Sequence, residues 1–270
     1  MTVATPIPGT LWLVGAGNMG RAMLDRWLAG GVVDPDRLLV IDPGATDLPA
    51  GVARVDTAPT DARPDILLLA VKPQMLGTVA PGLAHGRPRL LLSILAGVEA
   101  ATIAERIPAE TIVRAMPNLP VSLGRGVVAL HAHDADADAR ATAEALMAPL
   151  GLVEWLDDEV LFHAVTALSG SGPGFVYRFI AAMADAGAAL GLPADQAQRF
   201  AIATVEGAAA LARTSGAAPD ALADRVASPA GTTRAGLDVL DDGDALRRLV
   251  AATLTAAARR SEELAAAARG

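Results

Sequence analysis

Three glycines near the start of the chain have the spacing of a phosphate-binding loop. Residues 11–20 are Leu-Trp-Leu-Val-Gly-Ala-Gly-Asn-Met-Gly, so the pattern G-x-G-x-x-G follows an apolar run and precedes a helical pattern. Gly15 permits a tight turn, Gly17 lets the backbone approach a pyrophosphate, and Gly20 lets the helix pack closely on the strand. The pattern predicts dinucleotide binding at the N–H groups of the helix start, against the alternative of a glycine-rich turn with no ligand. The predicted cofactor contacts are Gly15, Ala16, Gly17, Asn18, Met19 and Gly20.

An acidic residue stands where the adenosine ribose of a dinucleotide is expected. Asp42 ends the second predicted strand, 22 residues after Gly20, and an acid at this place commonly accepts hydrogen bonds from the ribose. A carboxylate there repels a 2′-phosphate, and no arginine follows immediately to neutralise one, so Asp42 favours NADH. Asp42-Pro43-Gly44 is also an ordinary turn sequence, and that interpretation stays open.

Two more segments follow predicted strands at the edge where parallel sheets bind ligands. Residues 70–73 are Ala-Val-Lys-Pro and contain Lys72, the only lysine of the chain; residues 116–118 are Met-Pro-Asn. Both segments are expected to line the same crevice. On spacing alone, a surface lysine and a strand-ending turn are the alternatives.

A turn rich in small and hydroxyl-bearing residues leads into a predicted helix near Thr233. Its sequence is Ser-Pro-Ala-Gly-Thr-Thr over residues 228–233. Unpaired N–H groups and hydroxyls that face one spot suit a carboxylate. The alternative, an ordinary N-cap, is compatible with that function, because Ser and Thr are good caps.

Histidines and acids form two further patterns that are not expected to do chemistry. His131 and His133, with the acids at 134, 136 and 138, resemble a metal cluster, but their spacing fits no helical ligand set. Acids before a helix are favoured by its dipole, so we expect a solvated loop and no metal site. His163 lies among apolar residues and is expected to pack rather than act as a base.

The bulk composition limits the class of protein. Hydrophobic residues make up 52% of the 270-residue chain and charged residues 19%, enough to build a substantial core. A net charge of -8 argues against nucleic acid or an anionic membrane as the main partner. The absence of cysteine excludes disulfides and thiol catalysis. With no signal-like or membrane-spanning run, we expect a cytoplasmic protein.

The elements that must position these residues change type near residue 157. Before it, strands are predicted at 10–14, 38–41, 66–70, 90–94, 111–115 and 126–130, and helices at 19–29, 99–106 and 135–148. Strands that are apolar on both faces and alternate with helices predict a Rossmann-type, doubly wound parallel sheet over residues 1–157.

The second half has helical patterns only. Helices are predicted at 175–190, 194–212, 219–226 and 245–267, with another beginning near Thr233, so residues 158–270 form an all-helical domain. Helices this apolar and this few predict burial against another subunit, hence a homodimer or a larger homo-oligomer.

The chain resembles the pyrroline-5-carboxylate reductase family through six segments in fixed order. They are Gly15–Gly20, Ala70–Gln74, Ser93–Val98, Arg114–Asn118, Ser169–Pro173 and Ser228–Thr233. The resemblance spans nearly the whole chain, and the last two segments are far more specific than the glycine loop. The chain departs from the family at Gly174, Ala230 and Leu119, which affects the expected loop geometry.

The resemblance implies an NAD(P)H-dependent enzyme that reduces 1-pyrroline-5-carboxylate to L-proline. It implies that Thr233 hydrogen-bonds the imine nitrogen and that an anionic substrate is held by the loop before it. The implied substrate contacts are Ser171, Gly172, Ser228, Gly231, Thr232 and Thr233. The implied cofactor contacts beyond the glycine loop are Asp42, Ala70, Val71, Lys72, Pro73, Met116, Pro117 and Asn118.

Two other functions remain as alternatives. A reductase with the same two-domain architecture could act on another cyclic imine. A reductase that acts on a hydroxy acid would need a lysine as its acid-base residue in the helical domain, and that domain has no lysine. From a different class, a non-catalytic dinucleotide-binding paralogue would bind the cofactor without turnover.

Overall fold

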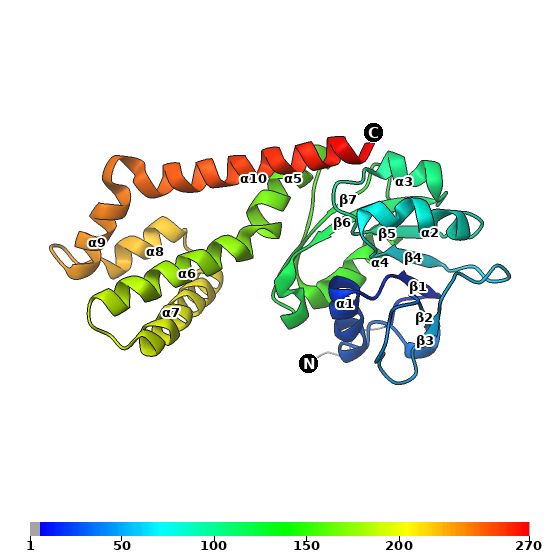
Figure 1. Ribbon diagram of the computed structural model, residues 1–270, viewed down its shortest axis with the longest axis horizontal. Helices are drawn as coiled ribbons and strands as arrows, with labels where there is room; N and C mark the ends of the chain where they lie inside the picture. Colours follow the sequence, from blue (N-terminus) through cyan, green and yellow to red (C-terminus); the bar gives the residue numbers. More distant parts are fainter. Residues whose placement is uncertain (1–5, 270) are drawn as a thin grey trace. The chain divides into compact units, whose positions relative to one another are not determined.

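The structure, a computed structural model, describes residues 6–269. These residues divide into two compact units, one made of residues 6–170 with 257–269 and the other of Ser171–Ala256 (Figure 1). The predicted boundary at residue 157 marks the change from strands to helices, which follows Trp155. As a domain boundary it stays a prediction, and each unit is described by itself.

The first unit is built on one eight-stranded sheet. Its strands are β1 (Leu11–Val14), β2 (Leu38–Ile41), β3 (Ala53–Val55), β4 (Ile66–Leu69), β5 (Leu90–Ser93), β6 (Thr111–Pro117), β7 (Gly126–His131) and β8 (Gly151–Trp155). The order across the sheet is β3-β2-β1-β4-β5-β6-β7-β8. The order reverses between β1 and β4, which is the topological switch point of a doubly wound sheet.

Helices cover both faces of this sheet. They are α1 (Asn18–Ala29), α2 (Leu76–Leu83), α3 (Ala100–Arg106) and α4 (Ala137–Met147). Alternate residues of a strand point to opposite faces, so Leu11 and Leu13 pack with α1 and α4 in one core, whereas Trp12 and Val14 pack with α2 and α3 in the other. Two cores flank one sheet, which confirms the predicted Rossmann-type architecture.

The sheet differs from the prediction at its two edges. β3 and β8 were not predicted, because β3 is short and largely exposed and β8 alternates half-buried with exposed residues. The sheet is also not parallel throughout, since β6 pairs with β7 antiparallel. β7 and β8 pair parallel to each other and so run opposite to the remaining strands.

A short helical segment closes the first unit. It consists of the 3-10 turn η5 (Glu159–Leu161), α5 (Phe162–Val165) and η6 (Thr166–Gly170), which is one turn of π-helix. Other 3-10 turns are η1 (Pro35–Arg37), η2 (Pro73–Met75), η3 (Leu119–Leu123) and η4 (Ala148–Leu150). π-turns often occur at functional sites.

The second unit is helical, as predicted. It contains α6 (Gly172–Ala189), α7 (Ala194–Ser215), α8 (Pro219–Val226), α9 (Thr232–Asp241), the 3-10 turn η7 (Asp242–Asp244) and the first half of α10 (Ala245–Arg269). Glycines in positive-φ conformations separate the helices at Gly191, Gly216 and Gly243. No described helix has the length and apolar character needed to cross a membrane.

The helical unit buries few of its apolar side chains. α6, α8 and α9 contain no buried residue, and α7 buries only Ala197 and Ala201. Large apolar side chains are exposed along these helices, among them Tyr177, Phe179, Phe200, Leu211, Val239 and Leu249. Exposed apolar surface of this extent is typical of a subunit interface.

Candidate active site

A cleft of about 470 Å³ lies at the carboxyl ends of the central parallel strands. Its walls come from the segments that follow β1, β2 and β4, which meet at the switch point. Six predicted cofactor residues line it: Gly15, Gly17, Asp42, Ala70, Val71 and Lys72. The cleft is therefore where this fold binds a dinucleotide.

The glycine loop is packed so tightly that two of its glycines cannot carry a side chain. Gly15 has φ +93°, and a Cβ there would meet the Ala70 carbonyl oxygen at 2.7 Å. A Cβ on Gly20 would collide with the carbonyl oxygen of Gly15. A Cβ on Gly17 would meet nothing within 4 Å, so that position is open to a ligand.

The first turn of α1 is available to an anion. The helix begins at Asn18 with Gly17 as its N-cap, and no side chain caps it. The first N–H groups of a helix have no partner within the helix and attract negative charge. The described loop thus fits the pyrophosphate of a dinucleotide. Ala16, Met19 and Gly20 belong to the same turn but do not line the cleft.

The Asp42 carboxylate joins β2 to the glycine loop. One of its oxygens accepts a hydrogen bond from the Ala16 N–H at 2.7 Å, and the other accepts one from the Gly44 N–H at 2.8 Å. Asp42 therefore fits both interpretations, because it is part of a turn and also lines the cleft where a ribose is expected. A carboxylate oxygen can accept a second hydrogen bond, so contact with a ribose is compatible with these bonds.

An arginine that sequence analysis did not single out lies beside Asp42. Arg54 of β3 donates to the carbonyl oxygens of Asp42 and Pro43 at 3.0 and 2.9 Å and forms an ion pair with Asp56 at 2.8 Å. Sequence analysis could not place Arg54 beside Asp42, because β3 itself was not predicted. A cation on β3 thus lies against the loop that carries the Asp42 carboxylate.

Lys72 is exposed at the end of β4, immediately before η2. It lines the cleft, whereas its neighbour Pro73 starts η2 and does not. Its ammonium group forms no hydrogen bond or ion pair with any part of the chain that the structure describes. Its side chain is free to reach a ligand, and contact with a cofactor stays a prediction.

Met116, Pro117 and Asn118 lie at the end of β6, outside this cleft. Met116 lines a separate cavity of about 460 Å³, and Pro117 is buried. Asn118 is 8% exposed and uses both ends of its side-chain amide: Oδ1 accepts from the Val127 N–H at 2.8 Å, and Nδ2 donates to the Ser169 carbonyl at 3.0 Å. A cofactor contact by these three residues stays a prediction.

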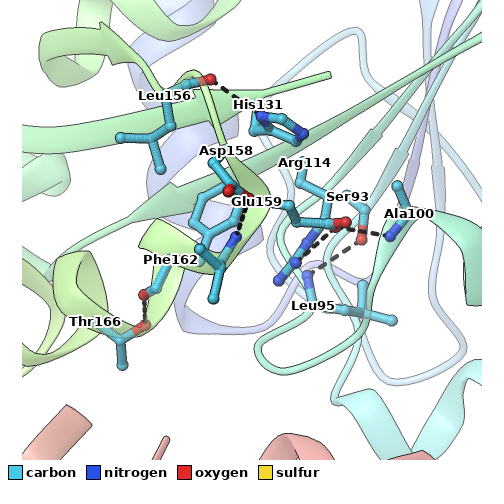
Figure 2. A network of polar contacts seen from close by, with 11 residues as sticks. Ser93, Leu95, Ala100, Arg114, His131, Leu156, Asp158, Glu159, Phe162 and Thr166 are labelled. Carbon is cyan, nitrogen blue, oxygen red and sulfur yellow. Dashed lines mark hydrogen bonds and ion pairs between the residues drawn. The ribbon is translucent and has the colours of Figure 1, made fainter. Parts of the chain in front are cut away.

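A partly buried ion pair connects β6 to the helical segment of residues 159–170 (Figure 2). Arg114 donates to Glu159 at 2.8 Å, and the same carboxylate oxygen accepts from the Ala100 N–H at 2.9 Å. The Arg114 guanidinium also lies 4.4 Å from the centre of the Phe162 ring. Sequence analysis placed Arg114 in a family segment without predicting this partner, which is 45 residues away.

His131 and His163, one from each histidine pattern, both contact oxygen atoms of other residues. His131 belongs to β7, is buried, and contacts the Leu156 carbonyl at 3.0 Å through Nδ1. His163 on α5 contacts the Ser261 hydroxyl at 2.9 Å. Within residues 6–269, no group of three or more histidines and acids is placed to hold a metal ion.

Ser171 and Gly172 stand at the start of α6, directly after the π-turn. Both are half-buried, and Ser171 is the N-cap of α6 without a side-chain cap bond. Its carbonyl accepts from the Gly174 N–H at 3.0 Å.

The segment Ser228–Thr233 forms a tight turn before α9. The Gly231 N–H donates to the Ser228 carbonyl at 3.0 Å, and Gly231 is the N-cap of α9, which begins at Thr232. No side chain caps this helix, so the Ser/Thr N-cap expected as an alternative does not form. The first N–H groups of α9 lack intrahelical partners, and the hydroxyls of Ser228 and Thr233 are on exposed residues beside them.

Charges near this turn are partly paired. Arg234 forms an ion pair with Asp224 at 2.7 Å, and this hydrogen bond raises the pKa of Arg234 above its ordinary value. Ala230 adopts φ +57°, a conformation that favours glycine, which the family usually has there.

One protomer does not bring its two groups of predicted substrate residues together. Ser171 and Gly172 begin α6, whereas Ser228 to Thr233 begin α9, and α9 lies toward the C-terminal end of α6 (Figure 1). α6 has 18 residues, about 27 Å of helix at 1.5 Å per residue.

The fold and the cleft define a dinucleotide-dependent oxidoreductase with a helical second domain. Comparisons with known proteins agree: residues 10–97 match the family model "NADP oxidoreductase coenzyme F420-dependent", and residues 159–264 match "Pyrroline-5-carboxylate reductase dimerisation".

Full-length relatives define the family. The chain is 39% identical to a pyrroline-5-carboxylate reductase of Synechocystis sp., over 94% of this chain and 97% of that one. A solved structure of a pyrroline-5-carboxylate reductase from Coxiella burnetii superposes with a TM-score of 0.87 at 33% identity, covering 95% and 98% of the two chains. A Plasmodium falciparum pyrroline carboxylate reductase with NADP bound gives 0.81 at 25% identity, covering 97% and 100%. The chain belongs to the pyrroline-5-carboxylate reductase family.

Gly20→Ala should weaken cofactor binding by roughly 10-fold or more. The new Cβ would collide with the Gly15 carbonyl, so the turn must open and the N–H groups move away from the phosphates. Titration of NADH fluorescence measures the dissociation constant, and chemical denaturation reports stability. Gly77→Ala in α2 is the matched control, because Gly77 does not line the cleft and its Cβ would meet only the Arg106 side chain, at an ordinary contact distance of 3.5 Å. Tight NADH binding by the Gly20 variant would contradict this geometry.

Proposed function

We propose that this protein reduces 1-pyrroline-5-carboxylate to L-proline with a hydride from NAD(P)H, the last step of proline biosynthesis. The observation that carries the proposal is the cleft at the sheet's switch point, lined by the glycine loop, in a chain that matches this reductase family over 94% of its residues. Hydride transfer is the chemistry that the bound nicotinamide supplies. The residues of this chain bind, orient and shield the reactants. The cytoplasmic location expected from the sequence is part of this proposal.

The turn before α9 is the proposed substrate site. The hydroxyl of Ser228 and the N–H groups of Thr232 and Thr233, which follow the N-cap Gly231, bind the carboxylate, since a helix start attracts an anion. The Thr233 hydroxyl hydrogen-bonds the imine nitrogen and orients the C=N bond. The nitrogen already holds a proton in the iminium form, so hydride addition at carbon completes the secondary amine and no strong acid is required.

The cofactor contacts are proposed along the edge of the sheet. The pyrophosphate lies on the start of α1, and Ala70 to Pro73 border it from the end of β4. Met116, Pro117 and Asn118, with Ser171 and Gly172, are proposed to border the nicotinamide end. These roles are supported by the cleft for the first group and by the family segments for the second.

Thr233→Ala should lower kcat on 1-pyrroline-5-carboxylate roughly 10- to 100-fold, because one hydrogen bond to the reacting group is lost. The loss of NADH or NADPH absorbance, with proline identified as the product, measures the reaction. Cofactor affinity should stay within about twofold of the wild type. Thr233→Ser, which keeps the hydroxyl, is the control. A fully active alanine variant would remove Thr233 from the mechanism, and an inactive wild type that binds cofactor would favour the non-catalytic alternative.

We propose that NADH is the better cofactor, because the Asp42 carboxylate repels a 2′-phosphate. Asp42→Asn removes the charge and keeps an acceptor for the Ala16 N–H. The ratio of kcat/KM for NADPH to that for NADH should rise roughly 10-fold, which corresponds to about 1.4 kcal/mol. Asp56→Asn is the control, because Asp56 is another acid that lines the same cleft but is paired with Arg54. A wild type that prefers NADPH would contradict the proposed role of Asp42.

We propose a homodimer in which the Thr233 turn of one protomer completes the site of the other. The separation of the two groups of substrate residues within one protomer supports this arrangement, as do the exposed apolar helices.

A mixture of two defective variants tests the shared site. Gly20→Ala and Thr233→Ala, each expected to be at least about 10-fold less active when the cofactor is well below saturation, are co-expressed or mixed through refolding and assayed under that condition. In a shared site, one of the two sites in a hybrid dimer is intact, so random pairing restores about a quarter of the wild-type activity. If each protomer supplied all its own site residues, every site would keep one defect and no activity would return. Light scattering gives the oligomeric state of each sample.

A further inference from the structure

Asn118 is proposed to border the nicotinamide end, yet both ends of its buried side-chain amide are bonded to the protein itself. We propose that Asn118 is a positioning residue: its amide supplies the hydrogen bond that the π-turn Thr166–Gly170 lacks, and thereby fixes the point where the chain enters Ser171 and Gly172. The inference rests on the proposed function for the role of those two residues.

The need for this hydrogen bond follows from the sequence of the turn. In an α-helix the carbonyl of Ser169 would accept from the residue four positions later, which is Pro173. Proline has no backbone N–H. The residue five positions later, Gly174, donates to Ser171 instead, at 3.0 Å. The Ser169 carbonyl therefore lacks a helical donor, and an unpaired buried carbonyl is costly.

Asn118 supplies the donor from another part of the chain. Its Nδ2 lies 3.0 Å from the Ser169 carbonyl oxygen, 51 residues away in sequence. The neighbouring hydroxyls cannot do so, because Thr166 and Ser169 donate to the carbonyls of Phe162 and Val165.

The orientation of the amide is fixed by partners of opposite polarity. At one end Oδ1 accepts from the Val127 N–H at 2.8 Å, and at the other Nδ2 donates to a carbonyl. A flipped amide would oppose N–H to N–H and oxygen to oxygen. The backbone of Asn118 is also held: its N–H donates to Val127 and its carbonyl accepts from Val121, at 3.1 and 3.2 Å. The residue is a rigid joint between β6, β7 and the π-turn.

Packing beside the joint leaves little freedom for the turn. A Cβ on Gly170 would meet the terminal methyl carbon of Met116 at 3.0 Å. The turn thus lies against the residue two positions before Asn118, and the amide is bonded to the residue before Gly170. The joint connects the end of β6, proposed to border the nicotinamide, with the turn from which Ser171 and Gly172 follow.

Asn118→Asp is the test, because the carboxylate still accepts from Val127 but cannot donate to Ser169. We expect kcat to fall roughly 10-fold at saturating NADH and substrate, with the NADH dissociation constant unchanged. Amide hydrogen exchange should become faster at residues 166–175 and stay unchanged in β1 and α1. Asn118→Ser, too short to reach Ser169, provides the same test if the aspartate variant does not fold.

Thr142→Val is the matched control. Thr142 is also buried and also donates to a backbone carbonyl, that of Asp138, at 2.8 Å, but it lies in α4. It should lower stability without lowering kcat. Unchanged exchange at residues 166–175 in Asn118→Asp would overturn the inference, whatever the wild type reduces. A lower NADH affinity with normal kcat would also overturn it, in favour of a cofactor contact. Failure of the proposed function would instead appear as a wild type without turnover.

Discussion

The close approach of two backbone segments in the first turn is the constraint on which the rest of the site depends. Gly20 lies against the carbonyl of Gly15, and Gly15 against that of Ala70, with no room for a Cβ at either glycine. This contact places the start of α1 directly at the ends of β1 and β4. The Asp42 carboxylate then bonds the same turn to β2. The cleft exists because three strand ends converge on one tight backbone turn.

Farther along the sheet, an ion pair and hydrogen bonds hold β6 to its neighbouring elements, as close glycine packing holds β1 to α1 and β4. Arg114 and Glu159 link β6 to η5 and to the start of α3, and Asn118 links β6 to β7 and η6. A buried ion pair stabilises only when further hydrogen bonds and contacts compensate its lost hydration. Here the Ala100 N–H and the Phe162 ring supply them. β6 and the segments that follow it are therefore held by specific polar partners as well as by apolar packing.

Patterns that repeat along the chain were predictable, and contacts between distant residues were not. The central strands and the glycine turn follow from apolar runs and from G-x-G-x-x-G, because local sequence determines both. β3 was missed, since it is short and exposed, and Arg54 was missed with it. The reversal of β7 had a signal: only residues 118–125 separate it from β6, too few for a parallel crossover. The Asn118 amide and the Glu159 carboxylate find their partners only when the chain is folded.

The π-turn has a consequence for the length of the chain. Its five residues make one wider turn than the α-helices on either side of it, so it acts as a one-residue insertion in a helical path. Removing one residue between Thr166 and Gly170 would let the path continue as regular α-helix. The residues after it would then keep their helical phase, whereas deleting one residue inside a regular α-helix rotates the residues that follow by about 100°, the angle between successive residues. The π-turn is therefore a place where the helical path absorbs a change of one residue in length, which regular helices such as α6 and α7 do not.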